Sequence, residues 1–286
     1  MNARLLLLLL ALPMLSCGPV RDDDDTAEDD DDDATSDDDD STFNDPPVFL
    51  AAYDFAMVVF LNTPNGVYEI IEGQMDVSVS TTRFLAELVT DGGQTYEWQG
   101  TLDSNQNAFS VFGNFRPPGA DTDTFFDIDG NFQGDAAGNP SQVCLTGTGE
   151  DDDPNFPDQG IRFVWYGCQL DAPPPANPPS PTYSVTSTIN ADLCGSWTAG
   201  TWNQTWALDG RLLRVTQFGF DGVGVVSDDG NVFRYTILEN NNPGRALKVV
   251  GNFGGAGDTE ATANGYCHGS KALLGGHSAV IDLDYP

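Results

Sequence analysis

Five closely spaced aspartates make one segment of the chain a candidate calcium site. Ca²⁺ takes about six to eight oxygen ligands, and a glycine among the carboxylates permits the sharp turn of a calcium loop. The segment D-I-D-G-N at 127–131 has this composition. The spacing departs from the EF-hand pattern and no Glu closes the loop, which favours the plainer interpretation of a hairpin turning at Asp129-Gly130. The candidate ligands are Asp121, Asp123, Asp127, Asp129 and Asp135.

Histidine is scarce, which limits the catalytic chemistry that can be assigned to the chain. His268 and His277 are the two histidines, and neither belongs to an H-E-x-x-H or a comparable metal motif. No G-x-S-x-G motif points to a nucleophilic serine. A glycosidase-like pair of carboxylates cannot be singled out among 29 acids from Pro46 onward. We therefore expect a non-catalytic protein, and a secreted hydrolase is the third of our hypotheses.

Tryptophans at Trp197, Trp202 and Trp206 are candidate binding residues in the second half of the chain. If exposed, such flat rings suit stacking on the apolar faces of sugars, although core positions are the favoured interpretation. The tripeptide G-S-W at 195–197 resembles the G-x-W signature near the first strand of lipocalins. The resemblance is confined to these three residues and implies a second hypothesis, a barrel that carries a small apolar ligand.

The N-terminus has the features of an export signal. Arg4 supplies a positive charge, and the apolar run at 5–12 is too short for a membrane-spanning helix, which needs about twenty residues. The sequence M-L-S-C at 14–17 resembles a bacterial lipobox, which implies removal of residues 1–16 and lipidation of Cys17. With Gly18 after the cysteine, the resemblance implies an outer-membrane lipoprotein on the periplasmic or cell-surface face. The alternative is an ordinary cleaved signal peptide followed by a free cysteine.

Four further cysteines are expected to form disulfides, because an exported protein meets an oxidising environment. Four cysteines allow three connectivities. We favour Cys144–Cys168 and Cys194–Cys267, because a proline-rich segment separates the two pairs. If an internal repeat makes Cys144 and Cys267 equivalent, their partners lie on a last strand and near a first strand. These strands are neighbours in a closed barrel, so both bonds could seal the same seam.

Negative charge dominates the composition and is concentrated near the N-terminus. The formal net charge is −33, and thirteen Asp and one Glu lie between Asp22 and Asp40 without a basic residue. Self-repulsion and the lack of apolar surface predict a disordered tether over 17–47. We expect neither nucleic acid nor anionic lipid headgroups as partners, because both require clustered Lys and Arg. The expected membrane contact is the N-terminal lipid.

Short repeats predict an internal duplication. The sequence V-T-D-G-G-Q-T-Y-E-W at 89–98 matches V-S-D-D-G-N-V-F-R-Y at 226–235 without a gap. S-V-F-G-N-F at 110–115 then matches K-V-V-G-N-F at 248–253. A third match joins Gly134-Asp135 and Cys144 to Gly257-Asp258 and Cys267, with eight residues between in each case. Three matches in one order favour two related domains.

Alternating apolar residues and frequent Gly turns predict an all-β fold without long helices. We expect two tandem antiparallel domains, at 48–170 and 183–286, each a meander or barrel or else a sandwich. The linker at 171–182 contains a run of prolines and should form a stiff spacer of roughly 28 Å. The expected strands are 53–61, 67–71, 75–80, 84–90, 95–102, 108–115, 143–148, 161–166, 183–189, 196–206, 212–219, 222–226, 232–238, 246–253 and 279–283.

The favoured hypothesis is a lipid-anchored, exported binding or structural module. Its partner would be a protein, a glycan or a small apolar ligand, and it would need no cofactor other than candidate calcium.

Overall fold

Sixteen strands make up the regular secondary structure of the residues that this computed structural model describes. The structure describes residues 45–61, 68–119, 121, 123–135, 137–151, 161–192, 200–239, 245–253, 258–267 and 277–284. The predicted signal peptide, Cys17 and nearly all of the tether lie outside these residues. Within the described ranges, no helix has the length and apolar character needed to cross a membrane. Both sheets belong to one compact unit, residues 42–286.

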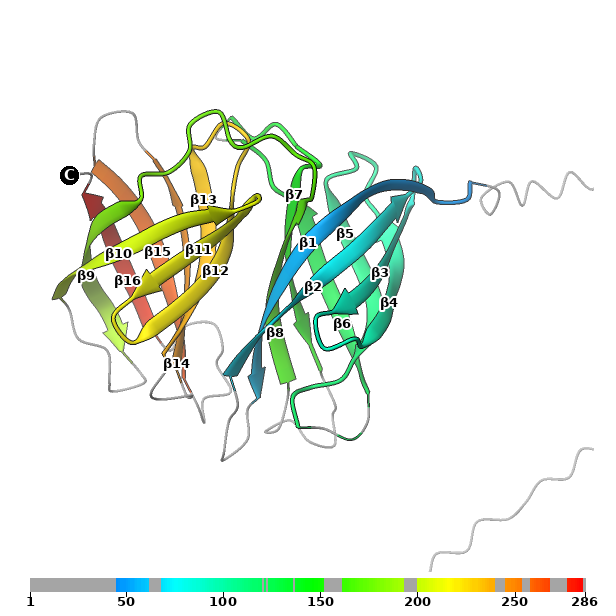
Figure 1. Cartoon of the computed structure of the whole chain (residues 1–286), viewed down its shortest axis with the longest axis horizontal. Helices are drawn as coiled ribbons and strands as arrows, with labels where there is room; N and C mark the ends of the chain where they lie inside the picture. Colours follow the sequence, from blue (N-terminus) through cyan, green and yellow to red (C-terminus); the bar gives the residue numbers. More distant parts are fainter. Residues whose placement is uncertain are drawn as a thin grey trace, which may run out of the picture. The chain divides into compact units, whose positions relative to one another are not determined.

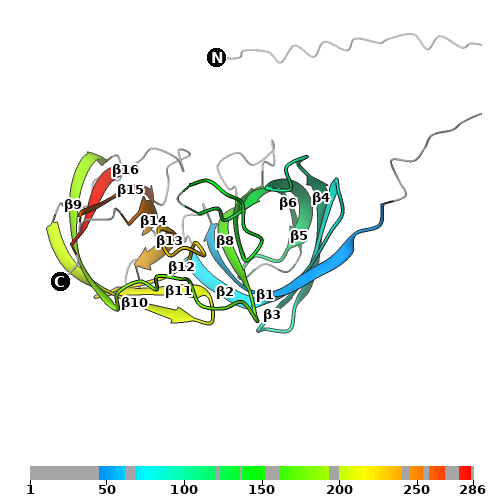
Figure 2. The same ribbon diagram turned by 90° about the horizontal axis from the view of Figure 1, so that it is seen from above.

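The first eight strands form a closed antiparallel barrel (Figure 1). Each strand pairs with the next, and β8 returns to pair with β1, so that the ring is closed when viewed from above (Figure 2). The strands are β1 (Val48–Leu61), β2 (Tyr68–Val79), β3 (Arg83–Thr90), β4 (Thr95–Leu102), β5 (Ala108–Phe115), β6 (Thr124–Phe132), β7 (Cys144–Glu150) and β8 (Ile161–Gln169).

The second eight strands close in the same way, because β9 pairs with both β10 and β16. The all-β prediction with two domains is therefore confirmed, and both sheets are barrels. The strands are β9 (Thr182–Asp192), β10 (Gly200–Asp209), β11 (Leu212–Gln217), β12 (Phe220–Val226), β13 (Val232–Glu239), β14 (Arg245–Asn252), β15 (Asp258–Cys267) and β16 (His277–Asp284).

Aromatic side chains fill the interior of the first barrel. Alternate residues of each strand point inward, as Tyr96 and Trp98 do on β4. The rings of Trp98 and Trp165 meet edge to face with their centroids 5.3 Å apart. Gly147 is required opposite Trp165, because a Cβ there would lie 2.2 Å from the indole Nε1. The small residues of β7 thus make room for the large rings of β8.

Most predicted strands are present, with ends shifted by a few residues, but two strands were missed. The segments 67–71 and 75–80 form the single strand β2. The Asp129-Gly130 pair, predicted as a turn, lies inside β6. At Gly130 the reason is packing, since a Cβ there would lie 2.4 Å from the Phe109 ring. The glycine therefore marks a close approach of a side chain and not a turn.

The predicted Cys144–Cys168 disulfide is confirmed, but its place in the barrel is not the predicted one. Cys144 on β7 and Cys168 on β8 are direct register partners. The bond therefore joins the last two strands and not the seam between β8 and β1. Cys194 lies outside the described residues, so the Cys194–Cys267 bond stays a prediction.

The sequence repeats do not fall on equivalent strands when each barrel is counted from its start. The ten-residue match spans β3 and β4 of the first barrel, but β12 and β13, the fourth and fifth strands, of the second. The third match fails structurally, because Cys144 begins β7 whereas Cys267 ends β15. The predicted equivalence of these two cysteines is therefore wrong.

The proline-rich linker does not act as the predicted spacer. Its Ala176 amide donates to the Asp228 carbonyl at 2.8 Å, and the Asn177 side-chain amide donates to the Asp229 carbonyl at 2.9 Å. Both acceptors belong to the turn between β12 and β13. The segment is tied to the surface of the second barrel, and the two barrels contact each other directly.

Candidate binding site between the barrels

An apolar cluster joins the outer faces of the two barrels. Val58 on β1 and Val164 on β8 pack in one cluster with Val223 and Val225 on β12. The segment F-A-M-V-V-F at 55–60 is buried throughout, because its two faces cover the barrel interior and this second cluster. A strand buried on both faces loses the simple apolar–polar alternation.

Asp228 connects the barrels through polar contacts beside this cluster. Its carboxylate accepts a hydrogen bond from Ser141 of the first barrel and pairs with Arg211 of the second. The Arg211 side chain is only 2% exposed, and burial lowers its pKa while Asp228 opposes that shift. The pair thus fixes the turn after β12 against the first barrel.

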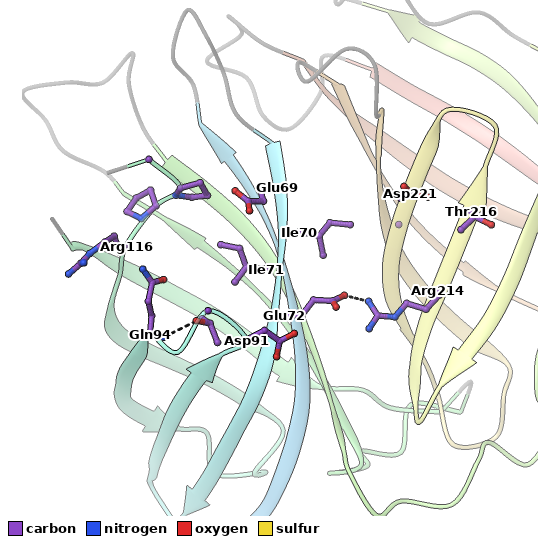
Figure 3. Close-up of a pocket in the computed structure, with 16 residues that line it drawn as sticks. Glu69, Ile70, Ile71, Glu72, Asp91, Gln94, Arg116, Arg214, Thr216 and Asp221 are labelled. Atoms are coloured by element: carbon purple, nitrogen blue, oxygen red, sulfur yellow. Dashed lines mark hydrogen bonds and ion pairs between the residues drawn. The ribbon is translucent and has the colours of Figure 1, made fainter. Parts of the chain in front are cut away.

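A groove with a volume of about 720 Å³ opens where β2 of the first barrel lies opposite β11 and β12 of the second (Figure 3). This volume falls within the range of about 300–1,000 Å³ that is typical of small-molecule sites. Ile70, Ile71, Pro117 and Pro118 supply apolar surface. The remaining lining is polar and consists of Glu69, Glu72, Thr90, Asp91, Gly92, Gln94, Arg116, Gly119, Arg214, Thr216, Asp221 and Gly222.

The two arginines of the groove are already paired with carboxylates. Arg214 on β11 reaches across the groove to Glu72 on β2 and also pairs with Asp209 at 3.2 Å (Figure 3). Arg116 pairs with Asp123 at 2.8 Å. Four acids line the groove against these two neutralised bases, so its electrostatic character is negative.

The pKa of Asp54, on β1, indicates the same negative electrostatic environment near the groove. Its carboxyl pKa is raised, first by burial and then by the negative charge of Asp209, with Asp91 adding to the shift. Arg214 acts in the opposite direction but does not cancel it. An approaching cation would meet a favourable potential here.

The structure does not gather the five predicted calcium ligands, and the predicted hairpin turn at Asp129-Gly130 is also wrong. Asp127 and Asp129 are exposed residues of β6, Asp123 pairs with Arg116, and Asp135 accepts hydrogen bonds from Asn139 within its own turn. Asp121 is exposed in the preceding loop. Among the residues that the structure describes, no three His, Cys, Asp or Glu side chains come together as a metal site would require.

The described tryptophans of the second barrel are core residues or nearly so. Trp206 is buried and donates its indole N–H to Gln204 at 3.1 Å, and Gln204 also accepts from Tyr235 at 3.1 Å. Trp202 packs partly buried against the same core. Trp197 and His268 lie outside the described residues, and His277 begins β16.

Sequence reasoning missed the groove, because its residues come from five separate segments of the chain. Glu72 and Arg214 are 142 residues apart. The one available signal was the scarcity of bases, nine from Pro46 onward, which makes each arginine in so acidic a chain a candidate structural or binding residue.

Comparison with known proteins gives no family assignment. No protein-family model matches the chain, and no curated protein sequence matches it. Among solved structures, the search matches a crystal structure of a protein of unknown function from the DUF3598 family of Nostoc punctiforme. The match has a TM-score of 0.28 and 7% sequence identity, and it covers 83% of this chain and 96% of that one. Similarity at this level carries no argument about function.

Proposed function

We propose that this protein is a lipid-anchored, exported binding module whose ligand occupies the groove between the barrels. The observation that carries the proposal is the groove itself, which has the size of a small-molecule site and combines apolar and charged lining. Its described lining contains no His, Cys, Ser, Tyr or Lys, so it offers no Ser–His or Cys–His pair for nucleophilic hydrolysis.

The packed interior of the first barrel favours a groove binder over a carrier that holds its ligand inside a barrel. Trp98, Phe109 and Phe163 lie within 6 Å of other core rings and occupy the space that a carried ligand would need. Hydrophobic surface is instead available outside, where Phe112 and Phe125 stack in the open on β5 and β6.

The negative charge of the groove favours a ligand with a positively charged group. Its apolar lining favours a ligand that also contains a hydrocarbon chain. Glu69 and Asp91 line the groove, and no ion pair among the described residues uses them. An amine would gain attraction from these carboxylates, while Ile70 and the two prolines would cover its methylene groups.

Spermidine is expected to raise the melting temperature of the purified protein by about 2–5 °C at saturation, because a ligand that binds only the folded state stabilises it. The Glu69→Gln/Asp91→Asn variant should lose most of this shift. Differential scanning fluorimetry with spermidine, laurate and cellobiose in parallel provides the measurement.

The matched control is Asp127→Asn/Asp129→Asn, which removes two carboxylates from the exposed face of β6. It should keep the spermidine shift. An equal loss in both variants would mean that spermidine responds only to net charge, and a shift with laurate alone would return the carrier hypothesis to first place.

Lipidation of Cys17 is a separate part of the proposal and rests on the resemblance of M-L-S-C at 14–17 to a lipobox. In a bacterial host, most of the protein is expected in the detergent phase of a Triton X-114 partition, because the lipid supplies the membrane affinity. Cys17→Ser should move it to the aqueous phase, and Gly18→Ala should not. Detergent partition that survives Cys17→Ser would refute the anchor.

A further inference from the structure

Two bases occupy neighbouring positions on the outer face of the second barrel. Arg234 on β13 alternates with the core residues Phe233 and Tyr235, so its side chain points outward. Lys248 on β14 alternates with the core residues Leu247 and Val249 in the same way.

The register of β13 and β14 brings these two bases together. Thr236 is the direct partner of Lys248, and Val250 is the direct partner of Arg234. Arg234 and Lys248 are therefore diagonal neighbours on one face, a distance that long side chains span easily. Burial lowers the pKa of Lys248, and the positive charge of Arg234 lowers it further, which is consistent with this proximity.

The bases lie where the second barrel meets the first. The hydroxyl groups of Thr236 and of Tyr166, on β8 of the first barrel, are 2.8 Å apart, and both residues are fully buried. Burial lowers the pKa of Arg234, and an electrostatic interaction with Tyr166 opposes this shift. Thr236, which lies on the same outward face of β13 as Arg234, thus places this face beside the interface of the barrels.

These bases differ from four arginines of the described residues in lacking a carboxylate partner. Arg116, Arg162, Arg211 and Arg214 each have a carboxylate oxygen within 4.0 Å. None of the ion pairs among the described side chains includes Arg234 or Lys248.

Both unpaired bases are also poorly solvated. Burial is the first cause that lowers the pKa of Arg234 and of Lys248. The Nε–H of Arg234 is buried without a hydrogen-bond partner. A partly buried positive pair without a counter-charge destabilises a fold, so an incoming anion would relieve a cost that already exists.

We propose that Arg234 and Lys248 form a binding site for a phosphate group. The planar guanidinium and the ammonium group supply directed N–H donors for phosphate oxygens. A phosphate carries a charge of about −1.5 to −2 near neutral pH, which balances two cations better than a single carboxylate does. The site is distinct from the acidic groove and does not depend on the function proposed for it.

Inorganic phosphate is the direct probe. At constant ionic strength, replacing chloride by phosphate is expected to raise the melting temperature of the purified protein by about 2–4 °C. Lys248→Met should weaken phosphate binding at least about tenfold in calorimetric titration, whereas Lys248→Arg should retain it. Arg83→Met, which removes one exposed positive charge from β3, should leave phosphate binding unchanged.

The melting temperature in the absence of phosphate distinguishes a phosphate-binding role of Lys248 from a purely structural role. Lys248→Met is expected to melt at the same or a higher temperature than the unmodified protein in chloride, because it removes an unpaired charge. A lower melting temperature in chloride together with an unchanged phosphate shift would overturn the proposal.

Vesicles identify the source of the phosphate group. The protein is incubated with phosphatidic acid vesicles and, in parallel, with phosphatidylcholine vesicles. Binding to the former that requires Lys248, without a response to free phosphate, would support the site and assign it to a lipid headgroup. The absence of both responses would refute it.

Discussion

Trp165→Ala is expected to lower the free energy of unfolding by about 3–5 kcal/mol, the range for deleting a buried aromatic side chain. Trp165 is fully buried, and its ring centroid lies 5.3 Å from that of Trp98 and 5.8 Å from that of Phe109. Gly147 lies next to the indole and has no side chain that could fill the cavity left by its removal. Equilibrium urea unfolding, followed by tryptophan fluorescence and circular dichroism, measures the loss.

Trp165→Phe is the matched control for this prediction. The indole Nε1 of Trp165 is buried without a hydrogen-bond partner, so the phenylalanine removes an unsatisfied donor while it keeps most of the apolar ring. We expect a loss below about 1.5 kcal/mol. If Trp165→Ala cost as little, the interior would be loosely packed, and the hypothesis of a ligand inside the barrel would regain support.

Alternation along single strands made much of the fold predictable from the sequence. The strands Thr95–Leu102 and Ala108–Phe115 were predicted with their observed ends, because buried and exposed residues alternate there without interruption. Turn glycines were equally informative, since Gly93, Gly210 and Gly230 adopt positive φ values of 78°, 59° and 78°.

The turn prediction fails where a glycine is needed for close packing inside a strand. The sequence favours a turn at Gly130, and no strand is predicted over the residues that form β6. In the structure the missing side chain of Gly130 makes room for Phe109. A single sequence does not distinguish these two uses of glycine, because the contact partner comes from another strand.

The interface of the barrels was unpredictable for a related reason. The buried run at 55–60 indicates a strand covered on both faces but does not identify what covers its outer face. The proline-rich segment suggested a spacer, although its backbone and side-chain hydrogen bonds hold it on the second barrel. Consequently the groove, whose residues meet only because the barrels meet, had no signature in the sequence.

Val164→Asp is expected to separate the two barrels without unfolding either one. Val164 is 2% exposed in the apolar cluster between the barrels, and that cluster shares no residue with the two interior cores. Burying an unpaired carboxylate there, with loss of the valine contacts, should cost at least about 3 kcal/mol of inter-barrel stability. Small-angle scattering should then show a larger radius of gyration, while far-ultraviolet circular dichroism should still report β-structure.

Val89→Asp makes the same chemical change at an outward-facing strand position that is 48% exposed. It should leave the radius of gyration unchanged and alter stability by less than about 0.5 kcal/mol, as is usual for surface substitutions. Because the groove is lined by residues of both barrels, Val164→Asp should also abolish the spermidine shift, whereas Val89→Asp should preserve it. A Val164→Asp protein with the original radius of gyration would show that the apolar cluster does not hold the barrels together.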